Sequence, residues 1–506
     1  MTRTLTTPPP IQRQNLKQAS LSFSQESLWF LQQLDPENTA YNTNFLVKFT
    51  GGIDLSPFER ALNELVRRHE PLRTVYPNHG GRPVQIIQPF EPFSLPFMDF
   101  SGLSGDEQQK AIRGFASEHG YRPFNLQRGP VVRFALLHIS KSEDYMFFCV
   151  HHIGFDGWSR EIYFSELIQY YDAFRSGKNA QLPELPVQYS DYASWQRKWL
   201  SGETLDAYID HWKNILSVDP PVLELPSDRP RPVMQSYRGA KYYFRLPLGF
   251  SSQIKDFCQK ERLTTFHMLL AAYAVMLMRY SGQEDIILGC PFANRSRAEV
   301  DGLVGLFVNT LPIRLNLRGN PTVRDFLDQV RATMLDAFTW QAAPFEALVS
   351  EVSPTRDLSR SPVFQVMINL KNVPKRQVSI EGLEMESVLR ENAPSPFDIS
   401  LEFDVENDGS LEASIQYNVD LYDENSIIHM VAHYQNLLGE MLMKVDKPLA
   451  GLEMLTPSER QRVLIDWNDL QADFPQVCIH DLISEQAAKN GNALAVTCNG
   501  NSLTYS

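Results

Sequence analysis

The stretch Tyr145-Met-Phe-Phe-Cys-Val150, with His151-His-Ile-Gly-Phe-Asp-Gly157 directly after it, decides the fold of this chain. The first six residues are a continuous apolar run, which is typical of a strand buried on both faces in the middle of a sheet. From Trp158 to Phe174 the apolar residues recur at helical spacing, which predicts an amphipathic helix. The residues between strand and helix therefore form a loop at a strand end, where catalytic groups are often presented.

The loop carries two adjacent histidines, an aspartate and a glycine. Successive side chains of a strand point to opposite sides, so we expect one of His151 and His152 to face a cleft and the other to face packing. The unperturbed pKa of imidazole, about 6.5, suits proton transfer near neutral pH. Asp156 can pair with an arginine and fix the loop, and Gly157 leaves room for the backbone or linker of a substrate.

The same residues also fit a loop with no chemistry. Asp156 can simply cap the helix that begins near Trp158. Gly154 and Gly157 can be turn residues only, and a His-His pair is usually structural. On the loop alone, the catalytic and the structural interpretation are equally good.

Other segments indicate mixed α and β structure in two halves. Ser56-Pro57 predicts the N-cap and first turn of an early helix, with Phe58, Leu62, Leu65 and Val66 on its buried face. In the second half, Thr264 or Thr265 is expected to cap an apolar helix from Phe266 to Arg279, and residues 285–288 and 307–315 are strand-like. Residues 181–195 are expected to cross between the halves, and the polar segment near 446–475 is expected to be a linker.

Composition excludes several classes of protein. The chain has 506 residues and a net charge of −13, so it repels nucleic-acid phosphates and a nucleic-acid partner is not expected. Its five cysteines are scattered and never in CxxC spacing, which argues against a disulfide framework and a metal site and fits the cytoplasm. The N-terminus has no apolar signal segment, and the most apolar helical run, Phe266 to Met278, is too short to span a membrane.

The pattern HHxxxDG, at His151 to Gly157, resembles the signature of condensation domains of nonribosomal peptide synthetases. Six more stretches resemble other motifs of that family in the same order: Leu21-Ser-Phe-Ser-Gln-Glu-Ser-Leu-Trp-Phe-Leu31, Arg68-His-Glu-Pro-Leu-Arg-Thr74, Tyr189-Ser-Asp-Tyr-Ala-Ser-Trp195, Gly305-Leu-Phe-Val-Asn-Thr310, Gln341-Ala-Ala-Pro-Phe-Glu346 and Arg356-Asp-Leu-Ser-Arg-Ser-Pro-Val-Phe-Gln365. The resemblance covers about residues 17–450. Seven motifs in one order are very unlikely to arise by accident.

The resemblance implies an α/β (α+β) fold of two chloramphenicol-acetyltransferase-like lobes in a V-shaped arrangement with a central tunnel. We expect a disordered tail at 1–16, an N-lobe at 17–185 and a C-lobe at 186–450. Residues 451–506 are expected to be a linker and the start of an adenylation domain. That expectation comes from Leu455-Thr-Pro-Ser-Glu-Arg460, Trp467-Asn468, Ile479-His-Asp-Leu482 and Ser502-Leu-Thr-Tyr505.

Carried over by motif, His152 is the catalytic candidate, either as the base that deprotonates the attacking amine or as a group that orients it. The resemblance makes His151 structural and gives Gly157 the role of leaving room for the thioester. Asp156 is expected to hold the loop through Arg295, or through Arg73 as second choice. Breaking such a buried pair from one side is expected to damage folding as well as activity.

Further residues are expected around the tunnel. Trp158, Ser159, Asn309 and Gln365 are candidate lining residues, and the last two fit equally well as groups that satisfy backbone atoms. Arg356 and Arg360 are expected to form ion pairs that stabilise a lobe.

The implied reaction is amide-bond formation between a donor acyl or peptidyl thioester and an aminoacyl thioester, both on phosphopantetheine arms of carrier domains. The domain itself is expected to bind no cofactor and to be a monomer with donor and acceptor carriers and a following adenylation domain as partners. Leu28-Trp29-Phe30-Leu31 favours a starter domain with a fatty acyl donor. The alternatives are an elongating domain that takes a peptidyl donor in trans, including one that ends in a D-residue, and a non-catalytic docking domain. Ser27 and Trp340 depart from the usual arginine and histidine of the family motifs and bear on this subtype.

Overall fold

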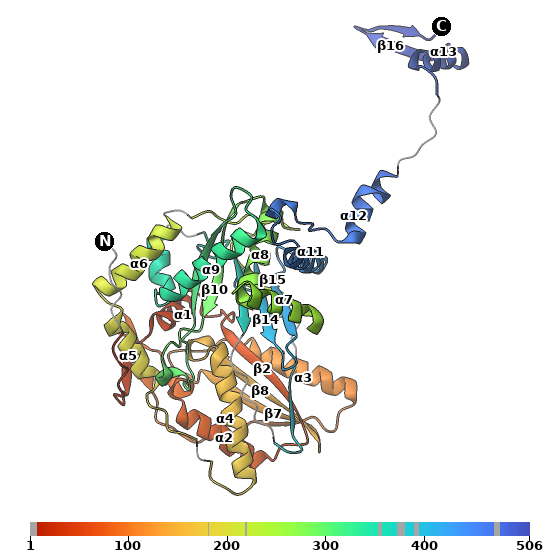
Figure 1. Ribbon diagram of the computed structural model, residues 1–506. Helices are drawn as coiled ribbons and strands as arrows, with labels where there is room; N and C mark the ends of the chain where they lie inside the picture. Colours follow the sequence, from red (N-terminus) through yellow and green to blue (C-terminus); the bar gives the residue numbers. More distant parts are fainter. Residues whose placement is uncertain are drawn as a thin grey trace. The chain divides into compact units, whose positions relative to one another are not determined.

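The computed structural model describes residues 8–180, 182–217, 220–352, 357–371, 380–388, 394–469 and 476–506 (Figure 1). The chain divides into two compact units, Met1–Met454 and Leu455–Ser506. The larger unit contains two hydrophobic cores, and each core is built around one mixed β-sheet.

The first core surrounds a five-stranded sheet in the order β13-β2-β8-β7-β6, in which β13 is Glu384–Ser387. Strand β8 (Glu143–His151) lies between β2 (Asn42–Thr50) and β7 (Val132–Ser140), and its residues from Tyr145 to Val150 are all buried. The predicted central strand is therefore confirmed. The other elements of this half are β1 (Gln18–Ser20), α1 (Phe23–Leu34), α2 (Leu55–Arg68), β3 (Thr74–Val75), β4 (Asn78–His79), β5 (Arg82–Ile87), β6 (Phe97–Asp99), α3 (Gly105–Gly120) and α4 (Gly157–Arg175).

Helices α2 and α4 pack against each other beside this sheet (Figure 1). The predicted buried face of α2 is confirmed, because Phe58, Leu62, Leu65 and Val66 are all buried. The predicted cap is wrong: the N-cap is Asp54, two residues before Ser56. A proline fits anywhere in the first helical turn, where the backbone N–H groups have no partner within the helix, so Pro57 does not set the start.

The second core surrounds a six-stranded sheet in the order β11-β10-β12-β14-β15-β9. Helix α8 (Thr265–Ser281) packs against α9 (Val323–Thr339) and α11 (Glu424–Met443), and all of its residues from His267 to Leu277 are buried. Thr264 is its N-cap, with the Thr264 hydroxyl accepting from the His267 N–H. The other elements are α6 (Glu203–Leu216), β9 (Gly239–Leu246), α7 (Leu248–Lys260), β10 (Asp285–Phe292), β11 (Asn309–Asn316), α10 (Phe345–Val352), β12 (Val366–Lys371), β14 (Ile399–Val405) and β15 (Leu411–Asn418).

The two halves are interwoven, so a division at 185/186 does not separate them. Helix α5 (Tyr189–Trp199) packs into the first core through Tyr189, Tyr192 and Ala193. Residues 300–307 contribute to the same core after the chain has already formed β10 of the second sheet. Strand β13 (Glu384–Ser387) then pairs antiparallel with β2 and becomes the edge of the first sheet.

Residues 8–16 are held by contacts with α5. The predicted disordered tail at 1–16 is therefore wrong for these residues. The Gln14 N–H donates to Asp191 at 2.9 Å, the Trp195 indole donates to the Pro9 carbonyl at 2.7 Å, and Ile11 is buried. Side chains of α5 thus satisfy the backbone groups of this segment and hold it in place. Residues 1–7 lie outside the described residues.

The smaller unit contains α12 (Pro457–Leu464), α13 (Ile479–Lys489), β16 (Leu494–Cys498) and β17 (Asn501–Thr504). Neither helix has a buried residue. Its resemblance to the start of an adenylation domain stays a prediction.

Among the described residues no single helix is long and apolar enough to cross a membrane. Helices α7 and α8, which meet at 105°, are together long and apolar enough for a bent span by length and composition only, but α8 is a helix of the second core.

Candidate active site

A cavity of about 2080 Å³ lies between the two halves of the larger unit. Side chains from β2 and α1 of the first half and from β9, β12, β14 and β15 of the second half line it. His152, Asp156, Gly157 and Trp158 of the predicted loop are also in its wall. The loop therefore meets this cavity between the two halves.

His152 begins a short 3-10 turn after β8 and lines the cavity. Its backbone N–H donates to the Tyr41 carbonyl at 2.9 Å. Its ring Nδ1 forms a short hydrogen bond with the Phe155 carbonyl. A carbonyl can only accept, so Nδ1 carries the hydrogen, and Nε2 of the neutral ring is left with a free lone pair.

His151 points the other way and is completely buried. Its Nδ1 accepts the Ile153 N–H at 3.1 Å, and its Nε2 has no hydrogen-bond partner among the described residues. Burial, together with the nearby His152 and Arg133, lowers the pKa of His151 to about 3. The ring is therefore neutral near pH 7. The two histidines divide between cavity and packing as predicted, although only His151 belongs to β8 and His152 lies in the turn that follows.

Asp156 is both a helix cap and half of a buried ion pair. Its Oδ1 accepts the Ser159 N–H at 2.8 Å, which caps α4. Arg295 donates to both carboxylate oxygens at 3.1 and 3.2 Å, and the Phe307 N–H donates to Oδ2 at 3.0 Å. The side chains of Asp156 and Arg295 are only 2% and 1% exposed, so this charge pair depends on its geometry to offset the loss of hydration.

Arg73, the second choice as partner of Asp156, lies elsewhere. It donates to the Gln88 carbonyl, and the acidic group that acts on it is Glu70. Among the other predicted ion pairs, Arg360 contacts Glu224 and Asp357. Arg356 lies outside the described residues.

Ser159 does not line the cavity, which corrects the sequence analysis. Its side chain is completely buried, and its Oγ lies 3.0 Å from both the N and the O of Gly305 and 2.7 Å from Asp156 Oδ1. Ser159 follows the cap by one helical turn and faces inward, so it ties α4 to the 305–309 segment. Trp158, its neighbour, does line the cavity and donates its indole N–H to the Asp301 carbonyl at 3.2 Å.

Asn309 and Gln365 take both of the roles between which the sequence left the choice open: each lines the cavity, and each satisfies backbone groups. The Asn309 amide donates to the Gln341 and Ala343 carbonyls at 2.8 and 2.7 Å. The Gln365 side chain accepts the Leu223 N–H at 2.9 Å.

The space beside Gly157 is open, because an added Cβ there would meet no heavy atom within 4 Å.

Sequence reasoning missed the polar wall that the second sheet presents to the cavity. Glu402 of β14 accepts from Lys241 at 3.1 Å and Lys371 at 3.2 Å. Burial alone would raise the pKa of Glu402, but the two ammonium groups together lower it. The alternation of buried Ile399, Leu401 and Phe403 with polar residues was the available signal, since it marks a strand with one wet face.

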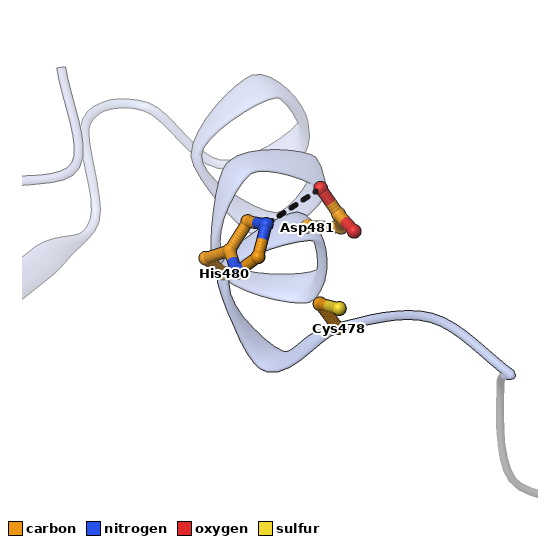
Figure 2. Close-up of side chains that lie close together, drawn as sticks. All are labelled: Cys478, His480 and Asp481. Atoms are coloured by element: carbon orange, nitrogen blue, oxygen red, sulfur yellow. Dashed lines mark ion pairs between the residues drawn. The ribbon is translucent and has the colours of Figure 1, made fainter.

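One further group of possible metal ligands lies in the smaller unit. Cys478, His480 and Asp481 come together at the start of α13, with His480 Nε2 3.5 Å from Asp481 Oδ1 (Figure 2). All three side chains are exposed and come from four consecutive residues. Such surface groupings are common in solvated helix ends, and we assign no metal to this one.

Comparison with known proteins gives the same family along most of the chain. The sequence profile described as Condensation domain matches residues 15–464. A linear gramicidin synthase protein of Brevibacillus parabrevis is 39% identical over 96% of this chain, which corresponds to 6% of that protein. The chain spans about 6 to 10% of the length of the first curated relatives that it matches.

Solved structures share the fold. A four-domain nonribosomal peptide synthetase bound to AMP and glycine matches 97% of this chain and 38% of its own, with a TM-score of 0.81 and 22% identity. The X-domain of teicoplanin biosynthesis, in complex with OxyB, matches 90% of this chain and 100% of its own, with a TM-score of 0.80 and 22% identity. These matches confirm the expected fold class. Because the family profile covers most of its residues, the chain belongs to the condensation-domain family of nonribosomal peptide synthetases.

Proposed function

We propose that this domain forms an amide bond between a donor acyl or peptidyl thioester and the amine of an aminoacyl thioester, each carried on the phosphopantetheine arm of a carrier domain. The observation that carries the proposal is the state of His152. Its ring lines the cavity, and the bond from Nδ1 to the Phe155 carbonyl leaves Nε2 as a proton acceptor.

In this reaction the amine nitrogen attacks the donor carbonyl carbon, the carbon–sulfur bond breaks so that the donor arm leaves as a thiolate, and the amine gives up a proton that ends on that sulfur. His152 Nε2 can take that proton or accept a hydrogen bond from the amine. An α-amino group has a pKa of about 7.7–8.0, so a useful fraction is free base near neutrality and positioning alone supplies part of the rate. The open space beside Gly157 admits the thioester.

For the donor we propose a fatty acyl group, on the resemblance of Leu28-Trp29-Phe30-Leu31 to starter domains, with a peptidyl donor as the alternative. The alternative of a non-catalytic docking domain is consistent with the fold that this chain shares with the teicoplanin X-domain, which was solved in complex with OxyB. The HHxxxDG loop, in which His152 Nε2 bonds to none of the described residues and borders the cavity, supports catalysis instead. We further propose donor and acceptor carriers and a following adenylation domain as partners in the cytoplasm.

Intact-protein mass spectrometry of the acceptor carrier tests the proposal. The carrier is loaded with its amino acid and incubated with this protein and either a fatty acyl or a peptidyl donor. We expect His152→Ala to slow transfer by roughly 10² to 10⁴, the usual contribution of a positioned acid or base. His79→Ala, which removes an exposed histidine of β4, is the matched control and is expected to leave the rate unchanged.

The outcomes separate the alternatives. Transfer of the fatty acyl group identifies a starter domain, and transfer of the peptidyl group alone identifies an elongating domain. A folded protein that transfers neither group would overturn the catalytic proposal in favour of docking. Wild-type rates in His152→Ala would remove His152 from the mechanism.

A further inference from the structure

Gln25 is a polar side chain of α1 that the proposed reaction does not use. It belongs to the sequence motif from Leu21 to Leu31 and is completely buried. Helix α1 packs against the turn His152–Gly154, which carries the candidate base. A buried amide group needs partners for both its donor and its acceptor atoms, so the contacts of Gln25 show which segments it holds together.

The amide of Gln25 bridges the start of α1 and the active-site turn. Its Oε1 accepts the Ser22 N–H at 3.1 Å, whereas its Nε2 donates to the Ile153 carbonyl at 3.1 Å and to the Tyr76 hydroxyl at 3.3 Å. The reversed amide would set Nε2 against an N–H and Oε1 against a carbonyl, so only one orientation satisfies these partners. Gln25 therefore binds the backbone of the residue that follows His152.

Pro71 and Tyr41 confine the same turn. An added Cβ on Gly154 would lie 3.1 Å from the Pro71 carbonyl oxygen, so the two backbones pass each other closely. The His152 N–H donates to the Tyr41 carbonyl at 2.9 Å. The bond between His152 Nδ1 and the Phe155 carbonyl spans this turn, so it depends on how firmly the turn is held.

We propose that Gln25 is a positioning residue that acts through His152. By holding the Ile153 carbonyl, it keeps the Phe155 carbonyl within reach of His152 Nδ1 and so fixes where Nε2 meets the substrate. This inference rests on the proposed function, because it concerns the use of His152 as a base or an orienting group. Gln25 itself does not line the cavity, so it is expected to act on the rate and not on substrate binding. A misplacement of a reacting group by about 1 Å costs roughly 100-fold in rate.

The separate measurement of kcat and KM in the carrier assay tests this role. Gln25→Met keeps the length of the side chain and removes the amide. We expect kcat to fall roughly 10- to 100-fold, with the KM values of both carriers unchanged. Gln85→Met is the matched control, because Gln85 is also buried in the first half and its Nε2 donates to the Ser20 carbonyl at 2.7 Å. A kcat of Gln25→Met equal to that of Gln85→Met would overturn the inference.

Gln25→Glu tests the hydrogen-bond donor while keeping the shape of the side chain. A protonated glutamic acid preserves both contacts, because its carbonyl oxygen accepts the Ser22 N–H and its hydroxyl donates to the Ile153 carbonyl. The ionised form has no donor and places a negative charge against that carbonyl. We expect kcat of this variant to approach the wild-type value at low pH and to fall where the carboxyl group ionises. A kcat as low as that of Gln25→Met at every pH would contradict the role of the donor.

The double variant Gln25→Met/His152→Ala separates positioning from a general structural role. If Gln25 acts through His152, Gln25→Met has no further effect on kcat once His152 is alanine, because no ring is left to position. If Gln25 only stabilises the fold, the two losses in kcat multiply, which would overturn the inference. A wild-type rate in His152→Ala alone would instead remove His152 from the proposed function, so the two failures are distinguishable.

Discussion

At the scale of the residue, the adjacent residues His151 and His152 place their imidazole rings in different environments. His152 has its Nδ1 tied to a carbonyl and borders the cavity, whereas His151 is sealed in the first core. A buried neutral histidine makes stability depend on pH, because the unfolded chain exposes the same ring to water. His151 therefore gives the protein a titration that is separate from catalysis.

We expect His151→Asn to flatten the pH dependence of unfolding. The folded-state pKa of His151, about 3, lies below its unfolded value of 6.5, so the unfolded state binds more protons between these limits. The contribution is fully present above pH 6.5 and is lost as pH falls, by up to about 1.4 kcal/mol per pH unit. An asparagine can still accept the Ile153 N–H without titrating. Urea unfolding at about pH 7.5 and about pH 5 measures the free energy of unfolding of the wild type and of His151→Asn. If both proteins lose the same free energy of unfolding between these pH values, His151 is not the source of the pH dependence.

At the scale of the element, the 305–309 segment holds the active-site loop from behind. Both backbone polar atoms of Gly305 contact Ser159 Oγ, and the Phe307 N–H donates to Asp156. A Cβ at Gly305 would lie 2.0 Å from Tyr189 Cδ2, so only glycine lets the segment pass Tyr189 this closely. The position of the segment, and through it that of the loop, depends on this contact.

Gly305→Ala is therefore expected to lower the free energy of unfolding by about 1–3 kcal/mol and to slow transfer, because the segment must move away from α5. Gly302→Ala is the control, since its Cβ would come no closer than 3.6 Å to Leu185. Urea unfolding and the carrier assay measure both effects. Equal behaviour of the two variants would show that the close approach to Tyr189 is unimportant.

At the scale of the whole larger unit, the two halves are joined by chain crossings and by one buried charge pair. Strand β13 and residues 300–307 extend from the second half into the first. The Asp156–Arg295 pair links the loop after β8 to the segment after β10. The cavity lies between the parts that these connections hold together.

Asp156→Ala is expected to lower the free energy of unfolding by about 3–5 kcal/mol, because it leaves the Arg295 guanidinium buried without its partner. Transfer should fall as well, since the cap of α4 is lost. The double variant Asp156→Ala/Arg295→Met should lose less than the sum of the single losses. Chemical unfolding and the carrier assay check this, and a well-folded, fully active Asp156→Ala would refute it.

Local patterns predicted the elements that carry the site. The apolar run from Tyr145 to Val150 and the helical spacing after Trp158 place a loop between β8 and α4, as the structure has it. Alternation along a strand predicted that His151 and His152 would separate. These features depend on neighbours in the chain, so a single sequence is enough to find them.

The amino-acid sequence by itself determined the family, the central strand, the loop and the candidate base, because each is written in consecutive residues. Only the tertiary structure decided that Arg295 and not Arg73 meets Asp156, that Ser159 faces inward, and that Arg73 instead donates to the Gln88 carbonyl. These outcomes depend on segments more than 100 residues apart, as the separation of 139 between Asp156 and Arg295 shows. The packing of the two sheets and their crossing segments determines which of several arginines reaches a buried carboxylate. That packing cannot be predicted from any local pattern in the sequence.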